Sequence, residues 1–187
     1  MNIFYKSMKH FNIISKHKWE VFKECYRAGI PLQGILHDLS KYTPSEFIEY
    51  AKYYNGKRSP VDQAKEEKGY CNAWLHHKGH NPHHYEYWID YLDDGGKPLI
   101  MPYKYAVEMV CDYIGAGKVY SGSNFNNNSP LEYWNNKKKT AKIHPKMIKF
   151  FDDIFADYAE CGELAIKKYN LTFHYEKNIG WIYDINA

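Results

Sequence analysis

Proline recurs in this chain directly after a residue that can cap a helix, and that pattern constrains the fold more than any other feature of the sequence. A residue with a hydroxyl or amide side chain directly precedes proline at Thr43-Pro44, Ser59-Pro60, Asn81-Pro82 and Ser129-Pro130. Such residues cap helix N-termini, and proline is favoured at the first helical position because no N–H is needed there. An acidic residue follows in the first turn at Glu46, Asp62 and Glu132. The pattern predicts four helix starts.

Apolar periodicity adds further helices. It predicts helices from about Ser15 to Ala28, from Pro31 to Asp38, from Pro102 to about Lys118, and one or two between Pro145 and Tyr169. Residues 121–129 are expected to form a polar loop, and the weak alternation in 171–187 favours an extended tail or a small hairpin. We therefore expect an all-α helical bundle with a short irregular or extended C-terminal tail.

Length and charge narrow the class of protein. A chain of 187 residues is expected to form one domain (1–187) that buries enough surface to fold without a disulfide or a metal. We therefore expect any bound metal to take part in the chemistry of the protein and not to be required for folding. A net charge of +3 and a pI near 8.5 suit a small anionic partner and make nucleic acid an unlikely one.

Cysteine usage and hydropathy favour a cytoplasmic protein with no membrane partner. The cysteines lack the paired spacing of zinc or redox sites, so we expect reduced core thiols at Cys25, Cys71, Cys111 and Cys161. The N-terminal segment has lysines but no uninterrupted apolar core, which argues against a signal peptide. No stretch approaches the roughly 20 apolar residues of a membrane span.

Several ionisable residues fall at positions where burial would require a compensating partner. His17 shares a helix face with the apolar residues Ile14, Val21 and Cys25. His37 and Asp38 end the following helix, and Asp112 lies inside the apolar segment YAVEMVCDYIGAG.

The segment AWLHHKGHNPHH adds five histidines around an expected helix break at Gly79 to Pro82: His76, His77, His80, His83 and His84. Each ionisable residue alone has a structural explanation, as a hydrogen-bonded core histidine, an ion-paired aspartate or part of a solvated loop. Their order along the chain is nevertheless distinctive.

That order resembles the HD-domain superfamily of metal-dependent phosphohydrolases over about residues 10 to 120. HDLSKY is similar to the superfamily's His-Asp signature with its following lysine, and VCDYIGAG is similar to its late metal-binding aspartate. The whole chain is still more similar to an uncharacterised family of small bacterial and phage proteins with HDLSKY and AWLHHK segments, which brings no established activity. Residues 121–187 would then add C-terminal helices and the tail.

The resemblance implies a metal centre with one or two ions. His17, His37, Asp38 and Asp112 would bind the first ion, and Asp38 would also bridge to a second ion. We favour His76 or His77, together with His83 or His84, as ligands of that second ion. Mixed nitrogen and oxygen donors suit Mn, Fe, Co, Ni or Zn better than Mg.

The function implied is hydrolysis of a phosphomonoester or phosphodiester in a nucleotide or other small phosphorylated metabolite. Asp38 and Lys41 are the candidate catalytic residues, and the candidate substrate-binding residues are Lys41, Lys78 and Lys118. Lys41 has alternatives as a solvated lysine or an ion-pair partner of Glu46. Two other functions remain open, an HD-type di-iron oxygenase and a non-catalytic nucleotide-binding protein, and the sequence also leaves homo-oligomerisation open.

Overall fold

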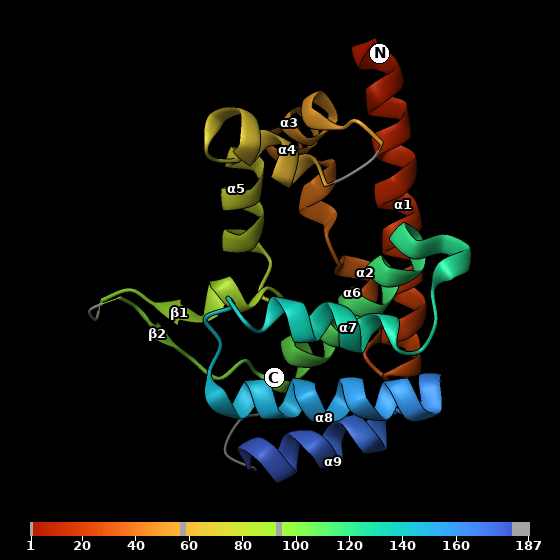
Figure 1. Ribbon diagram of the computed structural model, residues 1–187, viewed down its shortest axis with the longest axis vertical. Helices are drawn as coiled ribbons and strands as arrows, with labels where there is room; N and C mark the ends of the chain where they lie inside the picture. The colour runs from red at the N-terminus through yellow and green to blue at the C-terminus, as the bar shows by residue number, and fades with distance from the viewer. Residues whose placement is uncertain (1, 57–58, 93–94, 181–187) are drawn as a thin grey trace.

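The computed structural model describes residues 2–56, 59–92 and 95–180, which form an all-α fold with one very small sheet (Figure 1). The α-helices in chain order are α1 (Ile3–Arg27), α2 (Pro31–Leu36), α3 (Pro44–Tyr53), α4 (Pro60–Lys68), α5 (Asn72–His80), α6 (Tyr103–Ser121), α7 (Ser129–Lys137), α8 (Pro145–Cys161) and α9 (Lys168–Ile179). Short 3-10 helices are η1 (Leu39–Tyr42), η2 (Tyr85–Trp88), η3 (Gly122–Asn124) and η4 (Gly162–Leu164). The sheet pairs β1 (Ile89–Asp90) with β2 (Lys97–Pro98), antiparallel.

The main core lies between α1, α6 and the C-terminal helices α7, α8 and α9. Its largest buried side chains are aromatic and come mainly from α7, α8 and α9, including Trp134, Phe150, Phe155, Tyr158 and Tyr175. The close packing of α1 on α6 depends on Gly115, because a Cβ there would lie 2.7 Å from Val21 Cγ2 and 2.9 Å from the Val21 backbone nitrogen. This contact holds the two helices that carry His17 and Asp112 side by side.

Helices α3, α4 and α5 form a second, smaller packing unit at the end of the molecule opposite α8 and α9 (Figure 1). Its buried residues are Tyr50, Ala64, Cys71 and Ala73. Glu49 on α3 accepts hydrogen bonds from the Lys68 ammonium and from the backbone N–H of Ala73, and so links α3 to α4 and to the start of α5. The ionisable residues singled out from the sequence lie where this unit meets α1, α2 and α6.

Three of the four predicted proline-led helix starts are found, at Pro44, Pro60 and Pro130. The fourth is wrong: Asn81 follows the last residue of α5, and its side chain donates a hydrogen bond to the carbonyl of His77. The expected helix break at Gly79 to Pro82 is found, because α5 ends at His80 and Asn81 is its C-cap.

The ends of the chain differ from expectation as well. Helix α1 begins at Ile3 rather than near Ser15, because the Asn2 side chain caps it by accepting the N–H of Phe4. Residues 171–179 belong to α9 and bury Leu171 and Tyr175 against the main core, so the extended tail expected there is wrong. The rest of that expected tail, 181–187, lies outside the described residues.

The cysteines are free thiols, and three of them are buried as expected. Cys161, at the end of α8, is exposed and is not a core residue. Within the described part of the chain, no helix combines the length and apolar character needed to cross a membrane.

Candidate metal centre

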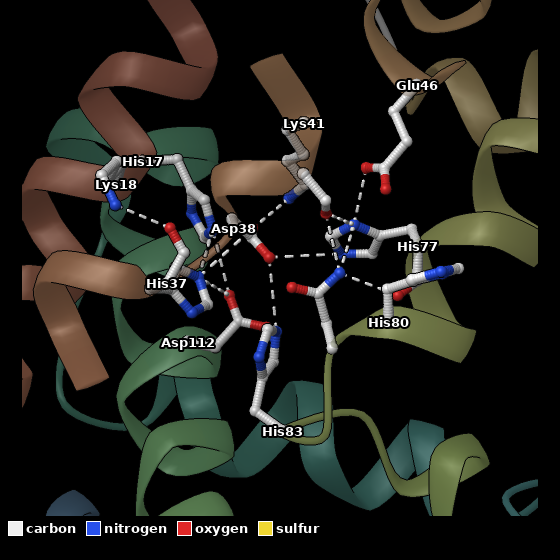
Figure 2. A network of polar contacts seen from close by, with 12 residues as sticks. His17, Lys18, His37, Asp38, Lys41, Glu46, His77, His80, His83 and Asp112 are labelled. Atoms are coloured by element: carbon white, nitrogen blue, oxygen red, sulfur yellow. Dashed lines mark hydrogen bonds and ion pairs between the residues drawn. The ribbon is translucent and has the colours of Figure 1, made fainter. Parts of the chain in front are cut away.

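The first group of interest, which we call the His17 cluster, consists of His17, His37, Asp38 and Asp112 (Figure 2). His17 lies on the buried face of α1, and its Nε2 is 3.1 Å from Asp112 Oδ1 on α6. The same nitrogen lies 3.3 Å from His37 Nε2 and 3.4 Å from Asp38 Oδ2. His37 Nε2 is 3.2 Å from Asp38 Oδ2. His17, His37 and Asp38 thus form one group of possible metal ligands, and Asp112 adjoins it through Oδ1, which is also 3.7 Å from His37 Nε2.

The backbone at Asp38 is unusual and explains how adjacent residues share a site. Asp38 has φ 54° and ψ 24°, and it is the one non-glycine residue with positive φ among the residues described. This left-handed conformation is costly for a residue with a Cβ and is found preferentially at functional sites. It turns the chain between α2 and η1 so that the side chains of both His37 and Asp38 point inward. Lys18 supports the turn by donating hydrogen bonds to the carbonyls of Ile35 and His37.

The second group, the His77 cluster, consists of Asp38, His77, His83 and His84. His77 comes from α5, and His83 and His84 come from the turn that follows this helix. His77 Nε2 lies 3.2 Å from Asp38 Oδ1, and His83 Nε2 lies 3.4 Å from the same oxygen. The two oxygens of Asp38 therefore face different clusters, with Oδ2 in the His17 cluster.

Both clusters fit a metal ion by geometry and by their unpaired atoms. Two ligands about 2.1 Å from one ion lie about 3.0 Å apart at adjacent octahedral positions and about 3.4 Å apart in a tetrahedron. The separations above, 3.1 to 3.4 Å, match these values. Among the described residues, three buried histidine nitrogens of the second cluster make no hydrogen bond: the Nε2 atoms of His77, His83 and His84. Lone pairs left in this way are typical of metal ligands.

Charge supports the same conclusion. The two clusters and their immediate partners contain four buried carboxylates, which belong to Asp38, Glu46, Glu108 and Asp112. Lys41 is the lysine paired with them, through Asp38 Oδ2 at 2.5 Å. The charge of Lys18 also acts on Asp38 and Glu108, but four carboxylates still outnumber these two lysines, and protonated histidines or bound cations can balance the excess. Buried charge in this excess favours cation binding.

The outer nitrogens of three candidate ligands are held by two glutamates. Glu108 Oε1 accepts hydrogen bonds from His37 Nδ1 at 2.9 Å and from His83 Nδ1 at 3.1 Å. Glu46 Oε2 accepts one from His77 Nδ1 at 2.8 Å. A carboxylate only accepts, so each of these rings carries its proton on Nδ1 and turns Nε2 toward the cluster.

The pKa values show how strongly these groups interact. Burial alone would raise the pKa of Glu108, but hydrogen bonds from His37 and His83 outweigh it and lower the pKa to about 2. Burial likewise opposes the lowering of the Asp112 pKa, which the hydrogen bond and charge of His17 produce. The pKa of His84 falls well below its ordinary value because of burial and the neighbouring His83 and His77. A neutral His84 has a lone pair available for a cation.

The other lysines and histidines expected at the site lie differently. Lys41 pairs with Asp38 rather than with Glu46, as described above. Lys118 is held by Glu24 and Glu163 on the other side of α6, and Lys78 is half-buried on α5; neither takes part in the described contacts of the clusters. His76 donates to Glu46 Oε1 from outside the clusters, and its ring stacks on that of His80. Of the paired alternatives, the structure brings His77 rather than His76 into the cluster, together with both His83 and His84.

Glu46 and Glu108 are the residues of the site that sequence reasoning missed. Glu46 was expected as a first-turn acid of its helix and as a possible ion-pair partner of Lys41, but not as a partner of the histidines. Glu108 lies four residues before Asp112, so the two acids share one face of an otherwise apolar helix. The four-residue spacing between Glu108 and Asp112 is the sequence feature that could have identified Glu108 as part of the site.

The chain matches the model of a family of unknown function, DUF5662, over residues 6–157. No curated protein and no solved structure matches it. The matched range covers most of the chain and contains every residue of both clusters, as well as Glu46 and Glu108. The chain therefore belongs to the DUF5662 family of unknown function.

Proposed function

We propose that this chain is a metal-dependent phosphohydrolase of the HD type, which acts on a nucleotide or another small phosphorylated metabolite. The observation that carries the proposal is the position of Asp38, whose two oxygens each face a separate group of buried histidines 3.2 to 3.4 Å away. One carboxylate shared between two such groups suits a pair of divalent cations.

The candidate ligands of one cation are His17, His37, Asp38 and Asp112, and those of the other are Asp38, His77, His83 and His84. Bound cations there would supply the Lewis acidity that polarises a phosphoryl oxygen and lowers the pKa of water. The chain's own part is to hold these ligands on α1, α5 and α6 and in the turns that follow α2 and α5, with the Nε2 atoms of His17, His37, His77 and His83 directed toward Asp38. Mn, Fe, Co, Ni and Zn all suit this mixture of nitrogen and oxygen donors.

Lys41 is the residue best placed to bind the phosphoryl group. Its side chain is 22% exposed and that of Asp112 is 13% exposed, whereas the side chains of His37 and Asp38 are at most 3% exposed. A substrate would therefore approach from the side of Lys41 and Asp112. The charge of Asp38 outweighs the effect of burial and raises the pKa of Lys41, so its ammonium stays charged and can stabilise negative charge that develops on phosphate oxygens.

The test combines metal analysis with a substrate screen. Protein purified without chelator should contain one to two transition-metal ions per chain. After reconstitution with Mn, Co, Ni, Fe or Mg, it should hydrolyse phosphomonoesters, phosphodiesters or nucleotides in a panel. Lys41→Ala should lower kcat by about 100-fold or more, the order typical of losing one group that stabilises the transition state, while the exposed Lys16→Ala should match wild type. Well-folded protein that hydrolyses phosphate esters without a metal would contradict the proposal.

A second function, an HD-type di-iron oxygenase, is favoured by one observation. The clusters contain five histidines and two aspartates, a nitrogen-rich set that also suits iron. Iron content together with substrate loss that requires dioxygen would support this function. Stoichiometric nucleotide binding without turnover in any metal would instead indicate a non-catalytic binding protein.

A further inference from the structure

We propose that Glu108 is a positioning residue that couples the two clusters, because a single oxygen of its carboxylate orients one candidate ligand in each. The inference rests on the metal centre of the proposed function and assigns a role to a residue outside both ligand sets. It requires no particular substrate.

The geometry around Glu108 is specific. Its Oε1 lies 2.9 Å from Nδ1 of His37 and 3.1 Å from Nδ1 of His83, and the centroids of these two rings are 4.5 Å apart. The second oxygen, Oε2, accepts a hydrogen bond of 2.9 Å from Gln33 Nε2. Glu108 is itself buried on α6, one turn before Asp112. Three donors from two segments, α2 with its C-terminal turn and the turn after α5, therefore fix the carboxylate.

The consequence for the histidines follows from the chemistry of a carboxylate, which accepts hydrogen bonds and does not donate them. Both rings must carry hydrogen on Nδ1, so in the neutral form of each ring the lone pair lies on Nε2 and can bind a cation that displaces any second proton. His37 Nε2 then faces Asp38 Oδ2 at 3.2 Å, and His83 Nε2 faces Asp38 Oδ1 at 3.4 Å. Glu108 thus prepares His37 for the first ion and His83 for the second.

Glu46 offers a matched comparison within the same chain. It is also a buried glutamate with two histidine partners, but these are His77 in one cluster and His76 in neither. If a glutamate acts only through the rings it holds, Glu46 affects the His77 cluster alone, whereas Glu108 affects both clusters.

Titration of chelator-stripped protein with Co²⁺ tests this difference, because its visible absorption reports the ligands around the ion. Wild type should bind in two steps. Glu108→Gln should weaken both steps by about 10 to 100-fold, the effect typical of losing an outer hydrogen-bond partner. Glu46→Gln should weaken only one step. A Glu108→Gln protein in which one step alone changes, or neither does, would overturn the inference.

A second measurement requires no variant and so does not depend on the folding of Glu108→Gln. In the Zn²⁺-loaded wild type, nuclear magnetic resonance should show slowly exchanging protons on Nδ1 of both His37 and His83. Absence of either proton would also overturn the inference. The outcome is separate from that of the proposed function: two weakened Co²⁺ steps in a chain without phosphohydrolase activity would support the coupling and reject the hydrolase. If wild type hydrolyses phosphate esters but Glu108→Gln weakens only one Co²⁺ step, the hydrolase would be supported and the coupling rejected.

Discussion

Oδ1 of Asp38, in the turn between α2 and η1, lies 3.2 Å from Nε2 of His77 on α5. Asp38 follows α2, which contacts α1, whereas His77 belongs to the smaller unit. The other oxygen of Asp38 faces His17 and His37. The carboxylate therefore joins the two clusters and also joins the two units.

This arrangement predicts that Asp38→Asn lowers the metal content of both clusters, while His77→Ala lowers that of one. The asparagine keeps the size of the side chain, but it has one fewer ligand oxygen and no charge. Elemental analysis after dialysis should give a loss of up to two ions per chain for Asp38→Asn and about one for His77→Ala. Equal losses in the two variants would show that Asp38 does not bridge.

The contact between α1 and α6 predicts a packing variant that acts on the metal centre from a distance. An alanine at Gly115 would place its Cβ within 3 Å of Val21 and push α1 away from α6. His17 lies one turn before Val21 on α1, and Asp112 lies one turn before Gly115 on α6. The 3.1 Å contact between His17 Nε2 and Asp112 Oδ1 should therefore lengthen. We expect a loss of about 1 to 3 kcal/mol in the free energy of unfolding, together with weaker metal binding.

The control for this prediction is Gly79→Ala on α5, where a Cβ would meet nothing within 4 Å. Alanine at such a helical position should leave stability unchanged or raise it by about 0.5 to 1 kcal/mol. Chemical denaturation with parallel metal titration would measure both effects. A Gly115→Ala protein as stable as Gly79→Ala would contradict the packing argument.

Some residues of this site could be predicted from the sequence, whereas the choice among others depended on how the helices pack. His17, His37, Asp38 and Asp112 were predicted together from the resemblance to the HD-domain superfamily, which rests on the His-Asp pair and on the aspartate within an apolar helix. Choosing between His76 and His77 required the rotation of α5 about its axis relative to Asp38, which is fixed by the packing of Ala73 and Trp74. The local sequence does not determine this rotation of α5.

The helix errors have a similar cause. Asn81-Pro82 matches a helix start, yet the Asn81 side chain bonds to the end of α5, and the chain then turns so that His83 and His84 reach Asp38. Residues 171–179 alternate only weakly, but α8 provides an apolar surface on which Leu171 and Tyr175 become buried. In both places, tertiary contacts outweigh the local preference.

Removal of metal is predicted to loosen α5 selectively. In the proposed centre, His77 on α5 and Asp38, which directly precedes η1, are ligands of one ion, so the ion stabilises the docking of the smaller unit. Hydrogen exchange of residues 72–80 should accelerate after treatment with a chelator, while α8, in the middle of the main core, should change little. Identical exchange before and after chelation would show that α5 is held by protein contacts alone.

The last prediction concerns His10, a buried histidine outside both clusters. Neither ring nitrogen of His10 has a hydrogen-bond partner among the described residues, and the ring packs against Phe47, Tyr50 and Tyr54 of α3 and its C-terminal end. Burial, with a smaller contribution from the charge of Lys41, lowers the pKa of His10 from 6.5 to about 4. The neutral ring is therefore the form that fits the folded protein.

The sign of the pH effect follows from this shift. The unfolded chain takes up a proton at His10 near pH 6.5, but the folded chain does so only near pH 4, so protons favour unfolding in that range. The stabilisation is complete above pH 6.5 and is lost as the pH falls toward 4, by about 3 kcal/mol in total. His10→Phe removes the titrating group and retains an aromatic ring. Urea denaturation at pH 7.5 and at pH 4.5, with metal chelated, should show a smaller loss of stability on acidification for His10→Phe than for wild type. An equal loss in both proteins would mean that His10 is protonated in the fold and finds a partner there.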